Sequence, residues 1–216
     1  MAFKAVFFDW RGTLVYLGTE LAWAQHALSM LGRDASEQAA QDVITRCTSL
    51  PDLADRLHDI DTDAARHKTA LMSVFKLAGL DDDLAAAMYA AESDYRRNPF
   101  AGDVPAVLAG VKARGIQVGV ISDIHFDLRP AFDDAGLGDL VDLYMLSFEQ
   151  GLQKPDAAFF QAALDGLQLQ AADVLMVGDR AKPDGGAVAL GMTTLLLPPL
   201  TSVDDHRLHL VEKLLD

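Results

Sequence analysis

The sequence is short of cysteine, of basic residues and of long hydrophobic runs, and each shortage excludes a class of protein. Cys47 is its single cysteine, which rules out an intramolecular disulfide and any metal site built from several thiolates. No apolar run approaches the roughly 20 residues that a membrane-spanning helix needs, and the amino terminus carries no signal-peptide pattern. We therefore expect a cytoplasmic protein that has no membrane partner.

Basic residues are outnumbered by acidic ones. The 216 residues include 18 Lys and Arg against 32 Asp and Glu, which gives a formal net charge of −14. Such a chain repels the phosphate backbone of nucleic acids, so we expect no nucleic-acid partner. Hydrophobic residues make up 50% of the sequence, which is enough for a sizeable core, either of one large domain or of a domain with an insertion.

One short apolar run near the start of the chain ends abruptly on a carboxylate. Residues 5–8 are all apolar, Asp9 follows them directly, and the turn-forming Gly12 comes soon after. A run of this kind predicts a fully buried strand of a parallel sheet. Open α/β sheets bind their ligands at the carboxyl ends of such strands, so Asp9 is a candidate functional residue. On its own it is equally consistent with the N-cap of a helix.

After this run the pattern becomes helical. Between about residues 20 and 98 the apolar residues recur every three or four positions, and strand signals are almost absent. These stripes predict several amphipathic helices, which form an inserted helical subdomain over residues 16–98. Residues 1–15 and 99–216 would then form one core domain.

From residue 102 onward, helices and strands alternate. Apolar runs bounded by turn residues predict four further strands, at residues 116–121, 142–146, 174–177 and 193–197. This order predicts an α/β fold with a doubly wound parallel sheet of the Rossmann-like kind. A last surface helix is expected over residues 203–215.

Polar residues follow these strands. Ser122 and Asp123 follow the second strand, Asp179 follows the fourth, and Lys154 and Asp184 lie in the loops beyond the third and the fourth. Each alone is an ordinary cap, turn or surface residue. The strand ends of a parallel sheet share one edge, however, so we expect these groups to converge with the first carboxylate. Together they supply a carboxylate nucleophile, a hydroxyl and a lysine for phosphate oxygens, and acids for a divalent metal ion.

These segments resemble the four motifs of the haloacid dehalogenase superfamily of hydrolases. The matching segments occur in the family's order, at residues 8–14, 120–123, 154–156 and 177–184. The predicted helical insertion lies where members of that family carry their mobile cap. The resemblance covers the whole core and implies the family's α/β fold.

The resemblance implies that Asp9 attacks the substrate and forms a covalent aspartyl-phosphate intermediate. Ser122 and Lys154 would hold the transferring phosphoryl group and offset its charge. The other phosphate-binding candidates are neighbours of these residues in the motifs, namely Gly12, Thr13 and Asp123. The implied substrate is a small phosphorylated metabolite, and we expect a monomer or a homodimer.

The resemblance also implies a Mg²⁺ cofactor. Its ligands would be the carboxylate of Asp9, the backbone carbonyl of Arg11 and the carboxylate of Asp179, with Asp184 either a direct ligand or one step removed. A cation is physically reasonable there, because two anions do not approach one another in a dry cleft unless their charge is neutralised.

Position 11 departs from the family pattern. In the family's phosphatases a second aspartate stands two residues after the nucleophile, protonates the leaving oxygen and later activates water. Arg11 stands there in this sequence, and its guanidinium stays protonated at any useful pH. Positioned acid–base catalysis contributes roughly 10²–10⁴-fold in rate, so we count Arg11 among the catalytic candidates as the residue that decides how active the enzyme is. A weakly active or non-catalytic protein that binds phosphorylated ligands is the main alternative.

Other activities fit the sequence less well. Phosphonoacetaldehyde hydrolases resemble the turn at Trp10 but need a cap lysine, and only Lys68 and Lys76 lie in the insertion. Haloacid dehalogenases work without metal and lack the acidic fourth motif found at residues 177–184. A receiver domain of two-component signalling is far shorter and has no helical insertion. His125 is the residue that we single out as another source of the missing proton.

Overall fold

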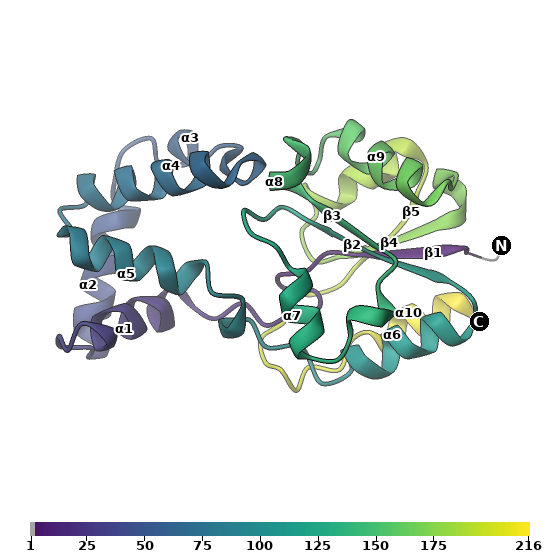
Figure 1. Ribbon diagram of the computed structural model, residues 1–216, viewed down its shortest axis with the longest axis horizontal. Helices are drawn as coiled ribbons and strands as arrows, with labels where there is room; N and C mark the ends of the chain where they lie inside the picture. Colours follow the sequence, from purple (N-terminus) through teal and green to yellow (C-terminus); the bar gives the residue numbers. More distant parts are fainter. Residues whose placement is uncertain (1–2) are drawn as a thin grey trace.

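The computed structural model describes residues 3–216 and shows a parallel sheet with helices on both faces (Figure 1). Its strands lie in the order β3-β2-β1-β4-β5, and all neighbours are parallel. Their bounds are Ala5–Phe8 for β1, Gln117–Ser122 for β2, Leu143–Leu146 for β3, Val174–Gly178 for β4 and Thr193–Leu196 for β5. The predicted fold class is confirmed, and each strand begins and ends within one residue of its predicted bounds.

The central strand β1 is buried on both faces by the helices of the core. These helices are α6 (Val104–Ala113), α7 (Arg129–Asp134), α9 (Ala157–Leu167) and α10 (His209–Leu215). Val6 and Phe8 belong to the cluster that contains residues of α6, α7 and α10, whereas Ala5 and Phe7 pack against α9. Side chains along a strand alternate between its two faces, so both faces of β1 must be apolar. This two-sided burial explains the continuous apolar run in the sequence.

The carboxyl-terminal helix is shorter than predicted. α10 begins at His209 and not at residue 203. The chain before it turns instead, because the carboxylate of Asp205 accepts hydrogen bonds from the backbone N–H groups of Thr201 and Ser202. Such local bonds compete with helix formation.

Helices α1 to α5 form a second body beside the sheet (Figure 1). They are α1 (Glu20–Met30), α2 (Glu37–Thr48), α3 (Leu53–Arg56), α4 (Ala64–Leu77) and α5 (Asp82–Glu92), with a 3-10 turn, η1 (Ile60–Thr62), between α3 and α4. They pack around a separate hydrophobic cluster whose buried members run from Ala24 to Met88. The predicted insertion thus has a core of its own, while its boundaries at residues 15 and 98 stay a prediction. Within residues 3–216, no helix is both long and apolar enough to cross a membrane.

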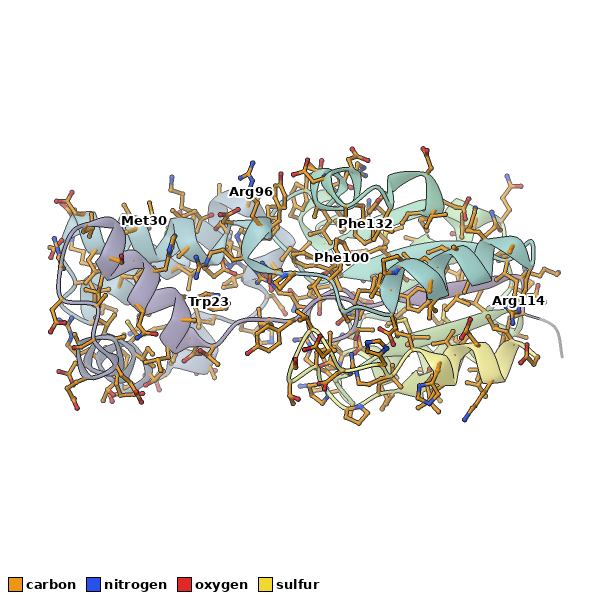
Figure 2. The ribbon with its side chains drawn as sticks, turned by 90° about the horizontal axis from the view of Figure 1, so that it is seen from below. Trp23, Met30, Arg96, Phe100, Arg114 and Phe132 are labelled. Carbon is orange, nitrogen blue, oxygen red and sulfur yellow. The ribbon has the colours of Figure 1, made fainter. Side chains whose placement is uncertain are left out.

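Two segments connect the helical body to the core and run side by side. The backbone N–H of Tyr16 donates to the carbonyl of Pro99 at 2.9 Å, and Val15 forms a bridge with Phe100. Figure 2 shows Phe100 next to Phe132 of α7, and their rings meet edge to face with centroids 4.9 Å apart. The returning segment is therefore anchored in the core.

The helical body touches the core at a second place. There η1 lies against α8 (Ser147–Gln150), the short helix that follows β3. The hydroxyl of Ser147 donates a hydrogen bond of 2.7 Å to the backbone carbonyl of Asp61. This contact brings a segment of the helical body over the carboxyl edge of the sheet.

Candidate active site

The strand order places two of the predicted acids next to each other. Asp9 follows β1 and Asp179 follows β4, and these strands are neighbours although the chain reaches β2 and β3 between them. The backbone N–H of Asp9 still donates to the carbonyl of Val177, at 2.9 Å, so the hydrogen bonding between β1 and β4 continues to the carboxyl edge of the sheet. The strand order reverses here, and such a reversal leaves the crevice in which open α/β sheets bind ligands.

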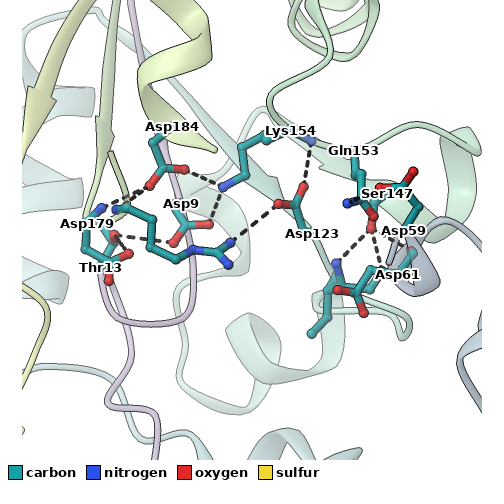
Figure 3. A network of polar contacts seen from close by, with 12 residues as sticks. Asp9, Thr13, Asp59, Asp61, Asp123, Ser147, Gln153, Lys154, Asp179 and Asp184 are labelled. Atoms are coloured by element: carbon teal, nitrogen blue, oxygen red, sulfur yellow. Dashed lines mark hydrogen bonds and ion pairs between the residues drawn. The ribbon is translucent and has the colours of Figure 1, made fainter. Parts of the chain in front are cut away.

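Lys154 joins the acids into one cluster. Its side chain is completely buried, and its ammonium donates to Oδ1 of Asp9 at 2.5 Å and to Oδ1 of Asp184 at 2.6 Å (Figure 3). Burial alone would lower the pKa of Lys154, but the carboxylates of Asp9, Asp123 and Asp184 more than offset this and raise it. The ammonium therefore stays charged and holds Asp9 in place.

Asp184 organises the loop after β4. Its Oδ2 accepts hydrogen bonds from the backbone N–H groups of Asp179 and Arg180, at 3.0 and 2.9 Å, while Lys154 binds Oδ1. Both carboxylate oxygens of this completely buried side chain are thus occupied. In this arrangement Asp184 positions Asp179 and Lys154 rather than facing the cleft.

Gly12 and Thr13 let the first loop approach Asp179 closely. Gly12 adopts φ of +82°, and a Cβ at that position would overlap the carboxylate of Asp179. The hydroxyl of Thr13 lies 3.4 Å from both Asp9 Oδ2 and Asp179 Oδ1. A larger residue at position 12 would be strained by its backbone and would push the two acids apart.

The three acids at this edge suit a hard divalent cation. Carboxylate oxygens of Asp9, Asp179 and Asp184 lie within 4.8 Å of one another. Burial, then the charges of Asp9 and Asp184, raise the pKa of Asp179 to about 6. The three carboxylates outnumber the single buried ammonium of Lys154. Oxygen ligands with excess negative charge are the environment that Mg²⁺ prefers.

Three of the predicted phosphate-binding residues, Gly12, Ser122 and Asp123, line a cleft of about 340 Å³, whereas Thr13 and Lys154 are buried and do not border it. Ser122 ends β2, is buried and borders the cleft together with Asp9 and Asp179. Asp123 accepts a hydrogen bond of 2.8 Å from the backbone N–H of Lys154, which ties the second motif to the third. Burial raises the pKa of Asp123 to about 6 although the charge of Lys154 opposes this.

Arg11 borders the cleft but directs its guanidinium at the helical body. Nη1 donates to Oε1 of Glu92 at 2.7 Å, Nη2 to the backbone carbonyl of Glu92 at 2.8 Å, and Nε to Oδ1 of Asn98 at 3.2 Å. The rings of Trp10 and Phe126 lie 5.5 Å from its central carbon. These contacts occupy the N–H groups with which a guanidinium binds an anion, so Arg11 links the loop after β1 to the end of α5.

Comparison with known proteins now decides the family. The haloacid dehalogenase-like hydrolase family matches residues 3–189. The chain belongs to this family.

The relatives of this hydrolase include phosphatases and dehalogenases. It is 31% identical over 104 residues to ribulose-1,5-bisphosphate 5-phosphatase from Halopiger xanaduensis, a stretch that covers 47% of this chain and 44% of that protein. The matched stretch thus spans less than half of that relative.

The solved structure of 2-haloacid dehalogenase from Pseudomonas syringae has a TM-score of 0.68 at 22% identity and covers 99% of this chain and 98% of that one. The HAD-hydrolase YfnB from Bacillus subtilis, solved with bound magnesium, has a TM-score of 0.72 at 14% identity and covers both chains completely. At these identities the two structures show the fold alone.

The sequence motifs do not include one group of polar residues in this hydrolase. His125 of the core was singled out from the sequence as a proton source. It is surrounded by three residues of the helical body, Asp61, His67 and Glu92. His67 stands one helical turn before Leu71 on the apolar stripe of α4, and Glu92 one turn after Met88 on that of α5. A polar residue in register with an apolar stripe is the sequence signal that could have found them.

The histidine pair is not arranged as a metal site. One ligand atom each of Asp61, His67 and His125 lies within 4.8 Å of the others. The two imidazole rings, however, stack with centroids 3.4 Å apart and planes 6° from parallel. A metal ion lies near the plane of each imidazole that binds it, at about 2.0–2.1 Å from the nitrogen, and parallel planes so far apart share no such point.

Proposed function

We propose that this hydrolase is a Mg²⁺-dependent phosphatase that acts on small phosphorylated metabolites through an aspartyl-phosphate on Asp9. The observation that carries the proposal is the pairing of Asp9 with the buried ammonium of Lys154, beside Asp179 at the reversal of the strand order. A carboxylate held in this way is an ionised, oriented nucleophile. The phosphatase relative supports the same reaction class.

The roles of the remaining residues follow from their contacts. The hydroxyl of Ser122 at the cleft and the ammonium of Lys154 beside Asp9 would bind oxygens of the transferring phosphoryl group, while Asp184 and Gly12 position the loops around Asp179. Asp9, Asp179 and the backbone carbonyl of Arg11 would hold Mg²⁺, which when bound neutralises the negative charge of the phosphoryl group. Residues 16–98 would act as the cap that selects the substrate.

The other activities considered from the sequence gain no support from the cleft. Within the described residues, no lysine of the helical body borders it, which argues against the imine chemistry of phosphonoacetaldehyde hydrolases. The acids Asp179 and Asp184 argue against a metal-independent dehalogenase.

A direct test combines turnover with trapping of the nucleophile. We expect the purified protein with Mg²⁺ to release p-nitrophenol from p-nitrophenyl phosphate, and to form a beryllofluoride adduct on Asp9 visible by ¹⁹F NMR. Asp9→Asn, which changes one oxygen for nitrogen at nearly constant volume, should abolish both signals and leave the melting temperature within a few degrees. Adduct formation without turnover would identify a phospho-ligand-binding pseudoenzyme, and the absence of both signals would contradict the proposal.

A further inference from the structure

The proposed phosphatase reaction needs a proton donor and acceptor that position 11 does not supply. Arg11 stays protonated, and its guanidinium is bound to Glu92 and Asn98. A leaving alkoxide must gain a proton, and the water that opens the aspartyl-phosphate must lose one. Another group at the cleft must therefore exchange that proton if the enzyme is to act on alkyl phosphates.

Asp61 is a carboxylate that the helical body brings to the same cleft. It lies in η1 and lines the cleft together with Asp9, Ser122 and Asp123. Its backbone carbonyl accepts the hydrogen bond from Ser147 of the core, which fixes η1 over the carboxyl edge of the sheet (Figure 3). The backbone of Asp61 is thus anchored to the core, and its side chain borders the cleft in which a leaving group would lie.

His125 lies directly behind Asp61 and offers it a nitrogen. Its Nδ1 is 3.7 Å from Asp61 Oδ1, is buried and has no hydrogen-bond partner among residues 3–216. A separation of 3.7 Å exceeds hydrogen-bond length, so a shift of less than about 1 Å is enough to form the bond. The ring itself is only 3% exposed and does not border the cleft, whereas Asp61 does.

The neighbours of His125 determine which nitrogen carries the exchangeable proton. Its Nε2 lies 3.2 Å from Oε2 of Glu92 and 2.9 Å from the hydroxyl of Ser93. The hydroxyl of Ser93 donates its hydrogen to Oε2 of Glu92 at 3.3 Å, so its oxygen accepts from Nε2, which keeps its hydrogen in both charge states of the ring. The nitrogen that can exchange a proton with Asp61 is therefore Nδ1.

The surrounding groups favour the ionised form of Asp61. His125 faces Asp61 from η1, His67 from α4, and Tyr89 and Glu92 from α5, and Arg11 neutralises Glu92. Burial acts to raise the pKa of Asp61, but the two histidines lower it below its usual value. Burial and the charge of His125 lower the pKa of His67 to about 4, so the ring that stacks on His125 is neutral near pH 7.

We propose that Asp61, supported by His125, is the proton-transfer group that replaces the missing aspartate of position 11. Asp61 is the catalytic residue of the pair, and His125 is the positioning residue that stores the proton. In the first half-reaction the carboxylate of Asp9 bonds to phosphorus and the phosphorus–oxygen bond to the leaving group breaks. The proton of His125 Nδ1 passes through Asp61 to that oxygen, which leaves as an alcohol.

The second half-reaction returns the proton. Water attacks the phosphorus of the aspartyl-phosphate and releases the carboxylate of Asp9 and inorganic phosphate. The proton lost by water passes through Asp61 to His125 Nδ1. The sum is hydrolysis of one phosphate ester, with no other reactant.

Three variants test this relay, which rests on the proposed phosphatase function. Asp61→Asn removes the acid at constant shape, and His125→Gln removes the Nδ1 group while it keeps a donor near the position of Nε2. Asp59→Asn is the matched control, because it makes the same change in the neighbouring turn and its side chain bonds Gln153 outside this cleft. Asn also tolerates the left-handed conformation of residue 59, whose φ is 52°.

The readout separates formation of the aspartyl-phosphate from its hydrolysis. With p-nitrophenyl phosphate, whose leaving group needs no proton, we expect Asp61→Asn to keep the initial burst within about threefold of wild type. The steady-state rate after the burst, and kcat on an alkyl phosphate such as glycerol phosphate, should fall roughly 10²-fold or more. His125→Gln should show the same pattern, and the double variant should be no slower than Asp61→Asn.

Specific outcomes would overturn the relay. Equal rates for Asp61→Asn and Asp59→Asn on both substrates would remove Asp61 from the chemistry. Equal loss of the burst and of alkyl hydrolysis would give Asp61 a general structural role instead. A normal wild-type burst with no alkyl hydrolysis refutes the relay and leaves the phosphatase function standing, whereas the absence of both burst and beryllofluoride adduct refutes that function as well.

Discussion

At the scale of single residues, the site depends on carboxylates whose charge the protein controls by burial. Asp123 is the clearest case outside the metal-binding group. Its side chain is only 7% exposed, its oxygens face the backbone N–H of Lys154 and the guanidinium of Arg180, and burial raises its pKa to about 6. Ionised Asp123 is therefore less favourable in the folded protein than in the unfolded chain.

This perturbation predicts a pH dependence of stability. Because the folded pKa lies above the unfolded value, the contribution of Asp123 is full below about pH 4 and is lost as the pH rises through about 6, by up to about 3 kcal/mol. Asp123→Asn removes this titration and keeps an oxygen for the N–H of Lys154. Urea unfolding in EDTA at pH 4.5 and 7.5 should show the variant gaining stability relative to wild type at the higher pH. A constant difference between the two proteins would show that Asp123 has an ordinary pKa.

The sequence predicted that the motif residues meet at one edge of the sheet, because their placement is local. Asp9 and Asp179 follow strands and Ser122 ends one, and the strand fixes where each residue lies. The partner of a long side chain was not predictable in this way. Arg11 belongs to the loop after β1, yet its guanidinium binds Glu92, 81 residues later. Only the packed structure brings such partners together.

At the scale of elements, Arg11 binds the carboxyl end of α5. It neutralises the side chain of Glu92 and donates to the backbone carbonyl of the same residue, where the helix dipole favours a cation. Arg11→Asp would restore the second aspartate of the family pattern, but it would place a carboxylate next to Glu92. This change alone would therefore remove the link between the loop after β1 and α5.

We predict that Arg11→Gln destabilises the junction of the two bodies. The ion-pair partners are only 19% and 14% exposed, so removal of one should lower the free energy of unfolding by about 1–3 kcal/mol. Hydrogen exchange should also increase over residues 93–99, the returning connection. Arg96→Gln is the matched control, because Arg96 lies in that connection but is 70% exposed and pairs at 3.5 Å. Similar effects of both variants would contradict a specific role for the Arg11 link.

At the scale of the whole molecule, the sheet and the helical body meet around the carboxyl edge of the sheet. The first of their contacts is between the connections, residues 15–19 and 93–99, and the second is between η1 and α8. The sequence predicted both bodies, because strand and helix periods are readable along the chain. It did not predict the second contact, since η1 has no periodic pattern and docks through a backbone carbonyl. That contact carries Asp61 into the cleft, so the residues that depend on docking were the ones missed.

Metal binding should therefore be visible as a property of the whole fold. Asp9 and Asp179 border the cleft at the ends of two neighbouring strands, and burial, then the charge of Asp9, raises the pKa of Asp179. A ligand that binds only the folded state stabilises it by about 2.7 kcal/mol at 100 times its dissociation constant. For a chain of 216 residues this raises the melting temperature by roughly 5–10 °C. We expect that difference between millimolar Mg²⁺ and EDTA at pH 7.5 in wild type. It should nearly vanish in Asp179→Ala and persist in Asp83→Asn, which removes an exposed acid on the helical body. Identical melts of wild type in Mg²⁺ and EDTA would remove the metal from the proposed mechanism.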